Sequence, residues 1–536
     1  MKNYIIGIIF LAGTLFMWSC GDQLDLDPAN ATTDEEILEL LASGDAETID
    51  LIMSGMANGM PLAFNGSGKS GAGTADDRYR SIQGLNYMRN LEANDIVFGD
   101  QVLGSFGASE YQFEDFISQS VDRNVYYWKH MWSIITDANK MLFYLTDETV
   151  GDNVTLKKYK AWGLVARAYA YAYLMETYQD SYLQGGNTKL GLMIYDTYDP
   201  NQEYKARSSS TATYAFIEND LETAINLLEA YFTSEDISGY TEDLQDIDLG
   251  VAKFLLARIK LITGEWDEVV SLCNDILSAY PDLIAEEYYG GANKGLDIRP
   301  ETNAFLFNDV NPEAILGFPS GLSLTHHNGW TNPFGEGSGG LGGGYSRIDD
   351  QLFVLIDDND YRQDCFLDTM IVDYTYPTNG VQDNVPVYTN LKFAATYGVG
   401  SDDPVQVGAV DCYYMRSSEV LLMKAEAQAQ GGSDSGAKET LNTLLAARTR
   451  DGATTLTCDN YSSMAGMSAL QMVQLQWRIE MWGEGGLEYL NNKRWGVSVD
   501  RTNSGIHTKK VTYDVAKMTC DIPDAEMLYN PLCEQN

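Results

Sequence analysis

The stretch that decides the fold is "GVAKFLLARIKLITGEWDEVVSLCNDILSAYP", residues 250–281. Apolar side chains from Ala252 to Ile259 recur at helical spacing and form one face. Gly264 then interrupts the helix, and a second apolar face starts at Trp266 and runs until a proline ends it. Two helices joined in this way are typical of a tetratricopeptide hairpin, which stacks on neighbouring hairpins.

The helical pattern continues on both sides of this hairpin. A capping box of Thr33 and Glu36 predicts a helix that opens there and runs to about Met56. Further helices are expected at residues 126–145, 160–180, 211–231, 415–432 and 436–452, and one more begins near Met467. The pattern predicts a mainly α fold, in which tetratricopeptide-like helix pairs form an α-α superhelical platform with long irregular ligand-binding loops and minor β structure.

The helical signal lapses between about residues 282 and 410. This part contains a glycine-rich stretch at 319–346 and a strand-like run, "PVYTNLKFAATYG", at 386–398. A long loop inside a compact domain is usually functional or disordered. We therefore expect one domain over residues 34–536, with helical repeats mainly at 123–281 and 411–496 and a loop-rich insert at 282–410. A mixed stretch is expected from the end of the first helix to about Asp122.

The first residues, "MKNYIIGIIFLAGTLFMWSC", read as an export signal. The apolar stretch from Tyr4 to Trp18 is shorter than the roughly 20 residues of a membrane span, and it follows a basic residue as in a signal peptide. Ser19-Cys20-Gly21 resembles a bacterial lipobox. We expect residues 1–19 to be removed, Cys20 to carry acyl chains, and residues 20–33 to form an acidic tether. An ordinary secretory signal with a chance cysteine is the alternative.

Composition narrows the possible partners. With 35 basic and 77 acidic residues the net charge is −42, which argues against binding to nucleic acid or to an anionic membrane surface. Six cysteines follow Cys20 at wide spacing, which fits neither a zinc ribbon nor a dense disulfide framework. Cys273 lies on an apolar helical face and is predicted to be a free core thiol. Pairing among the other cysteines stays open.

No stretch carries a convincing catalytic or cofactor motif. "AFNGSGKSG" at 63–71 has the spacing of a phosphate-binding loop, but no buried strand precedes it and no helix follows it directly. The four histidines form no H-E-x-x-H, and no G-x-S-x-G is present. We expect no enzymatic activity and no cofactor. "DLQDIDLG" at 243–250 and "DDND" at 357–360 leave a structural calcium as a weaker alternative, because neither matches an EF-hand loop.

Several stretches occur in a characteristic order along the chain. They are the lipobox with "LDLDP" (24–28), "YYMRSSEVLLMKAEA" (413–427), "LNTLLAARTRDG" (441–452), "RIEMWGEGGLEYLNNKRWG" (478–496) and "IPDAEMLYNPLCEQN" (522–536). Together they resemble the SusD/RagB family, the surface nutrient-binding lipoproteins of Bacteroidetes. Gly486 looks like an extra residue, and Glu488 and Asn491 stand where the family commonly has Arg and Asp, which puts one local ion pair of the scaffold in doubt.

The resemblance implies a fold, a location and a partner. The fold would hold four tetratricopeptide-like helix pairs, and the chain would sit at the cell outer membrane on its lipid anchor, facing outward. It would dock on a SusC-like TonB-dependent transporter and capture an oligosaccharide, or a peptide as in the RagB branch. The family has no catalytic activity of its own. A surface glycan hydrolase is a more distant alternative.

Candidate ligand residues follow from the chemistry of sugar binding. Aromatic faces stack on the apolar patches of sugar rings, and Asn, Asp and Arg bond the hydroxyls. Three stretches offer such side chains: Trp330, Asn332, Phe334 and Tyr345; Asp77, Arg78, Tyr79, Asn94 and Asp95; and Tyr288 with Tyr289. The alternatives are that Trp330 anchors its loop and that Asp95 caps one. The cluster around Trp330 favours a glycan over a peptide, since a peptide site needs amides more than exposed rings.

Overall fold

The computed structural model describes residues 33–42, 45–57, 82–98, 108–113, 117–241, 243–318, 345–375, 382–396 and 411–536. The described helices are α2 (Asp34–Ala42), α3 (Ala46–Ala57), α5 (Ile82–Leu91), α6 (Ala108–Gln112), α7 (Asp122–Tyr144), α8 (Asp147–Val150), α9 (Val154–Tyr178), α10 (Ser210–Glu235), α11 (Leu249–Thr263), α12 (Trp266–Ala279), α14 (Asp350–Phe353), α15 (Ser417–Gln430), α16 (Asp434–Ala447), α17 (Ala469–Glu480), α18 (Leu487–Trp495) and α19 (Asp524–Tyr529). The strands form short antiparallel pairs: β1 (Ile96–Val97) with β3 (Arg347–Ile348), β2 (Ala314–Phe318) with β6 (Cys412–Arg416), β4 (Ile371–Thr375) with β5 (Gln382–Val385), and β7 (Val499–Asp500) with β8 (Thr512–Tyr513).

The predicted helical hairpin is confirmed as α11 and α12. The Asp248 carboxylate accepts a hydrogen bond from the Val251 N–H at 3.0 Å and so caps the start of α11. At the end of this helix Gly264 has φ +88° and donates its N–H to the Lys260 carbonyl at 2.9 Å. A left-handed residue at this position suits glycine, because a Cβ is strained there.

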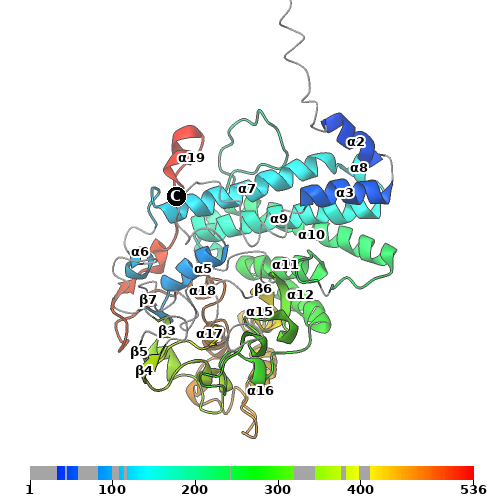
Figure 1. The fold of residues 1–536 in the computed structure, drawn as a ribbon. Coiled ribbons are helices and arrows are strands. Elements are labelled where there is room, and N and C mark those ends of the chain that lie inside the picture. The colour runs from blue at the N-terminus through cyan, green and yellow to red at the C-terminus, as the bar shows by residue number, and fades with distance from the viewer. Residues whose placement is uncertain are drawn as a thin grey trace, which may run out of the picture.

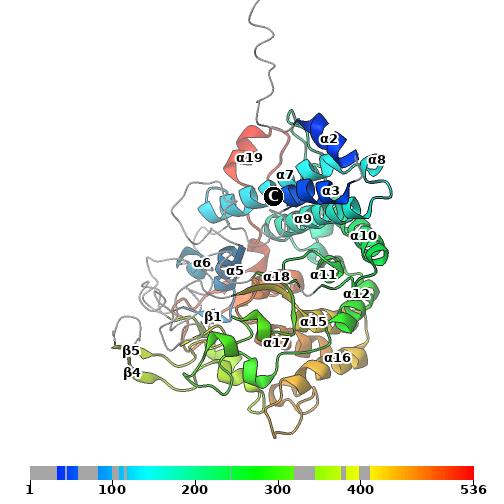
Figure 2. The ribbon, with the colours of Figure 1, turned by 45° about the vertical axis from the view of Figure 1, so that its right-hand side comes forward.

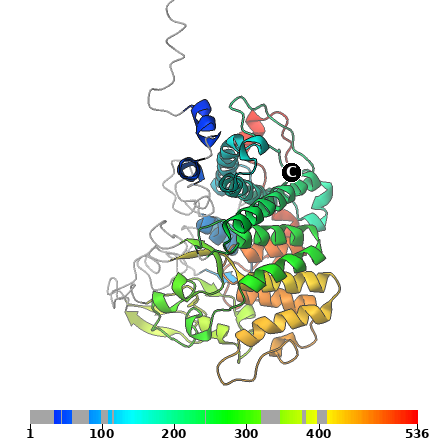
Figure 3. The ribbon, with the colours of Figure 1, turned by 90° about the vertical axis from the view of Figure 1, so that its right-hand side faces the viewer.

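Successive helices stack from α7 through α9, α10, α11 and α12 to α15 and α16. Figure 1 labels these elements, and Figure 3 shows them as a column along one side, with the β4 and β5 strands on the other. One hydrophobic core contains residues from Leu41 to Cys533. The predicted mainly α, tetratricopeptide-like fold is thus confirmed. In the described ranges, no helix is both long and apolar enough to cross a bilayer.

The first predicted helix is two helices. Its capping box forms as expected, since the Glu36 N–H donates to Thr33 Oγ1 at 3.2 Å and the Thr33 N–H donates to Glu36 Oε2 at 2.9 Å. The helix nevertheless ends at Ala42. The Asp45 carboxylate accepts from the Glu47 N–H at 3.2 Å and opens α3 instead. The continuous helix to Met56 was therefore wrong, because a new N-terminal cap interrupts it.

Two further expectations need correction. Residues 82–91, placed in a mixed stretch, form the helix α5, which is buried on nearly every side and so shows no amphipathic stripe. In the strand-like run, described up to residue 396, the only pairing is by isolated bridges at Thr389 and Asn390. There the Asn390 side-chain oxygen accepts from the Lys392 N–H at 2.8 Å. Such a side chain to backbone bond competes with strand pairing.

A buried group of charges, the ionic cluster, joins distant parts of the chain. Glu480 at the end of α17 accepts from Arg448 Nη2 at 2.9 Å, Arg416 Nη1 at 2.7 Å and Arg362 Nη1 at 2.9 Å. Glu313 bridges Arg416 and Arg448 from the other side, at 2.7 and 2.5 Å. The cluster comprises the cations Arg362, Lys392, Arg416 and Arg448 and the carboxylates Glu313, Asp360, Glu480 and Glu484.

The ionic cluster is electrically balanced, which makes its burial tolerable. Charges taken out of water are costly unless they are paired and hydrogen-bonded. Burial by itself would raise the pKa of Glu480, but the charges of Arg448, Arg416 and Arg362 outweigh it and hold this pKa well below 4.5. Glu480 therefore stays ionised at neutral pH.

We expect Glu480→Gln to lower the free energy of unfolding by about 3–5 kcal/mol, because three guanidinium groups lose a buried counter-charge. Urea unfolding of the two proteins at neutral pH measures the difference. The folded-state pKa of Glu480 lies below its value in an unfolded chain, so the stabilisation is complete above pH 4.5 and is lost as the pH falls. Glu439→Gln, on the exposed face of α16, is the control, and an equal effect there would contradict the assignment.

The six described cysteines are all free and buried, which confirms the prediction for Cys273. Burial raises the pKa of Cys458 and Cys533 to about 11, and only the thiolate reacts readily. We expect the form that starts after Cys20 to resist thiol labelling when folded. Unfolding it without a reductant should release all six thiols, counted by mass spectrometry, and a lower count would reveal a disulfide.

Candidate functional site

Two of the predicted ligand loops lie outside the described residues. Residues 58–81 and 319–344 are not among the described ranges. The predicted contacts that fall in them are Asp77, Arg78, Tyr79, Trp330, Asn332 and Phe334. These six stay predictions from sequence.

Asn94 and Asp95 form a turn that a carboxylate of α18 holds in place. Glu488 accepts from the backbone N–H of Asn94 at 2.8 Å and of Asp95 at 2.9 Å. The Asp95 side chain is 2% exposed and accepts from Arg478 Nε at 2.9 Å, so it forms an ion pair with α17 rather than the loop cap that was the alternative to ligand contact. Asn94 is only partly buried and bonds Glu488 through its amide as well, at 3.1 Å.

Glu488, which departs from the family pattern, has a local structural role in this chain. Burial and the charge of Asp95 raise its pKa to about 8, and it binds backbone donors rather than an opposite charge. Asn491, the second departure from the family pattern, accepts from Arg494 Nη2 at 2.8 Å. The two residues therefore support the fold by hydrogen bonds where the family pattern places an ion pair.

The predicted tyrosines differ in how much surface they offer. Tyr289 is 1% exposed, and its ring lies 4.7 Å from the Arg448 guanidinium and 4.9 Å from the Phe305 ring. It is therefore a core ring that supports the ionic cluster. Tyr345 is 8% exposed, and its hydroxyl reaches Asp383 Oδ2 at 3.4 Å. Tyr288 is partly buried against the main core.

The predicted ligand face consists of the three stretches that carry the candidate ligand residues. Its described parts lie close together in the fold. β1 follows Asp95 directly and pairs with β3, so that Ile96 stands opposite Ile348. Tyr345 precedes β3 and packs with Leu391 in a small apolar cluster. A Cβ at Gly291, close to Tyr288 and Tyr289 in sequence, would lie 2.5 Å from Leu391 Cβ. Figure 1 shows β3, β4 and β5 together at one end of the molecule, and Figure 2 shows β4 and β5 there with β1 nearby.

Sequence reasoning missed three exposed apolar side chains in this part of the fold. Val354 after α14 is 66% exposed, Met370 is 53% exposed and Val372 of β4 is 64% exposed. They were missed because aromatic rings were taken as the signal for a ligand face. An exposed apolar residue next to a β-hairpin is a weaker signal, since such residues are common on any surface.

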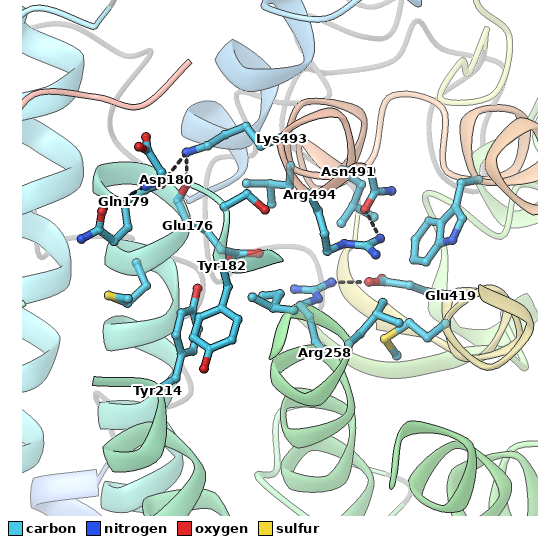
Figure 4. A pocket seen from close by; sticks show the side chains of 18 residues that line it. Glu176, Gln179, Asp180, Tyr182, Tyr214, Arg258, Glu419, Asn491, Lys493 and Arg494 are labelled. Carbon is cyan, nitrogen blue, oxygen red and sulfur yellow. Dashed lines mark hydrogen bonds and ion pairs between the residues drawn. The ribbon is translucent and has the colours of Figure 1, made fainter. Parts of the chain in front are cut away.

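A second concavity, the interhelical cleft, lies where α9 and α11 meet α15, α17 and α18. It has two chambers, with empty volumes of about 570 and about 840 Å³, which share Glu176, Arg258 and Glu419. Figure 4 shows Arg258 facing Glu419 across the first chamber. Lys493 donates to the carbonyls of Glu176 at 2.7 Å and of Gln179 at 3.0 Å. Sequence reasoning missed this cleft because its walls come from helices far apart in the chain.

The described polar clusters have structural partners. His507 bonds Tyr111 Oη through Nδ1 at 2.6 Å and the Asn94 carbonyl through Nε2 at 2.7 Å, and burial lowers its pKa to about 3. In the "DDND" stretch, Asp360 pairs with Arg362, and Asp357 accepts from the Ser462 N–H at 2.8 Å. Over the described ranges, no three His, Cys, Asp or Glu side chains are grouped so as to hold a metal.

Comparison with known proteins gives a consistent picture. A model of the SusD family matches residues 366–528, and a model described as "Starch-binding associating with outer membrane" matches residues 84–238. No curated protein matches the chain.

Solved structures share the fold. A SusD-like carbohydrate binding protein from Bacteroides vulgatus is 20% identical with a TM-score of 0.68, covering 92% of this chain and 97% of its own. A sugar binding protein from the same species, described as putative, is 20% identical with a TM-score of 0.64, covering 90% and 97%. A SusD superfamily protein from Bacteroides thetaiotaomicron is 19% identical with a TM-score of 0.65, covering 92% and 99%. Residues 366–528, which the SusD family model matches, contain Arg416, Arg448 and Glu480 of the ionic cluster. The chain belongs to the SusD/RagB family.

Proposed function

We propose that the chain is a surface lipoprotein that captures oligosaccharides and delivers them to a SusC-like TonB-dependent transporter of the outer membrane. The observation that carries the proposal is the match of residues 84–238 to a family described as starch-binding and associated with the outer membrane. The names of two similar structures, a carbohydrate binding and a sugar binding protein, support the same ligand class. Capture and transfer leave the ligand chemically unchanged, so no catalytic group is required.

The described scaffold suits a binding face made of loops. The ends of the predicted ligand segments are held by the β1–β3 pair and by the Glu488 bonds to Asn94 and Asp95. Fixed loop ends reduce the ordering cost of binding. Trp330, Phe334 and Tyr79 would supply rings for the sugar faces, and Asn332, Asp77 and Arg78 would bond hydroxyls.

We expect the soluble form that starts after Cys20 to bind one class of neutral oligosaccharide by isothermal titration. Trp330→Ala should weaken this binding at least about tenfold, a loss of about 1.4 kcal/mol, because a stacked ring is typical of a binding hot spot. Tyr204→Ala, which removes a ring that is 53% exposed and belongs to none of the predicted ligand stretches, is the matched control and should bind as the parent does.

Mixed oligopeptides form the second arm of that titration. If peptides give binding heat and sugars give none, oligosaccharide capture is overturned. The chain would then be assigned to peptide capture on the same scaffold. An unchanged sugar affinity in Trp330→Ala would leave the function standing and make Trp330 a loop anchor.

The lipid anchor has its own test. In a host that processes lipoproteins, we expect the full chain to partition into the outer-membrane fraction and its N-terminal peptide to carry acyl chains on Cys20, as measured by mass spectrometry. Cys20→Ser should abolish both, because the hydroxyl does not replace the acylated thiol and anchoring needs the buried chains. Acylation-free attachment of Cys20→Ser to the membrane would contradict the anchor.

A further inference from the structure

Three charged side chains in the walls of the interhelical cleft have no opposite partner among the described residues. Lys493 donates to carbonyl groups only. Arg89 donates to Thr177 Oγ1, and its guanidinium lies 4.0 Å from the Tyr173 ring centroid. The Glu176 carboxylate makes no hydrogen bond or ion pair to any described residue, although its charge acts on Arg89, Arg258 and Lys493.

The remaining charges of the cleft are balanced. Arg258 pairs with Glu419, Arg494 with Glu426, Asp180 with Lys189, and Arg416 with Glu484. Two unpaired cations therefore face one unpaired carboxylate. The walls carry an excess of one positive charge inside a chain whose net charge is −42. An unpaired charge in a low-dielectric site is costly, so a mononegative ligand would stabilise this arrangement.

Buried hydrogen-bond donors point to the same chemistry. Arg89, Gln179 and Trp477 are among the residues that line the two chambers. The Arg89 Nε, Gln179 Nε2 and Trp477 Nε1 groups are buried and have no acceptor among the described residues. Their side chains are only 2%, 4% and 3% exposed. All three groups donate, so the complementary ligand is rich in acceptor oxygens. Buried donors are nearly always satisfied in native proteins, by protein, water or ligand.

We propose that the interhelical cleft binds a small carboxylate-bearing molecule, such as a sugar acid, at a site separate from the loop face. Arg89 and Lys493 supply the counter-charge, and Gln179 and Trp477 donate to the ligand oxygens. Asp180, Ser181 and Tyr182, after α9, are the partly exposed residues at the edge of the first chamber.

The test uses the soluble form with three probes at neutral pH and physiological salt. Glucuronate should bind in isothermal titration, acetate should bind more weakly, and glucose should give no heat. Trp477→Phe keeps the ring but removes the N–H, and should weaken glucuronate binding about threefold or more. Glu176→Gln removes the competing carboxylate without breaking a described bond, and should tighten binding by a similar factor. Glu203→Gln, an exposed residue with the same change of charge, should leave it unchanged.

Equal binding of glucose and glucuronate would overturn the assignment of an anion site. The assignment would also be overturned if glucuronate bound neither the parent nor Glu176→Gln. Ordered water would then be the partner of the buried donors. If acetate binds with the same affinity as glucuronate, the site recognises the carboxylate alone. The proposal then holds for small carboxylates in general. Glucuronate binding should be unchanged in Trp330→Ala, so that titration separates the cleft from the loop face and the two sites can fail separately.

Discussion

The fold depends on the balanced burial of charge around Glu480. Its carboxylate meets guanidinium groups from the start of α15, the end of α16 and the loop-rich insert. Apolar helix faces can pack in several registers, whereas these hydrogen bonds have fixed lengths and directions. Removing any one member leaves another charge buried without a partner. The helical stack and the irregular insert are therefore locked to each other in one arrangement.

The ionic cluster also lies between the two candidate binding regions. Tyr289, which belongs to the predicted ligand face, packs on Arg448. Arg416 and Glu484 line the second chamber of the interhelical cleft. One rigid network thus forms the back wall of both regions.

Local sequence pattern predicted the helices whose apolar residues form one stripe. Gly264 and Trp266 placed the α11–α12 turn correctly, because a glycine turn and a new apolar face are local signals. The helix α5 escaped prediction since it is buried on nearly all sides. Likewise, Asp45 was not recognised as a cap that divides 34–56 into two helices.

The candidate site was harder to predict, because burial depends on contacts between distant segments. Tyr289 stands in a glycine turn, where sequence alone does not distinguish a ring that faces the core from one that faces solvent. Asp95 was placed correctly near a loop, but its partner Arg478 lies 383 positions away. The ionic cluster appeared in the sequence only as separate family motifs, since Arg448 and Glu313 are 135 positions apart.

The hydrogen bond from the Asn94 N–H to the Glu488 carboxylate joins residues 394 positions apart in the chain. This separation has a consequence for the order of folding. In a chain synthesised from its N-terminus, Asn94 is present long before α18 is available. Closing so long a loop carries a large entropic cost, which only the finished set of contacts offsets. The turn at Asn94 and Asp95 therefore lacks its α18 partner until residue 488 has been synthesised.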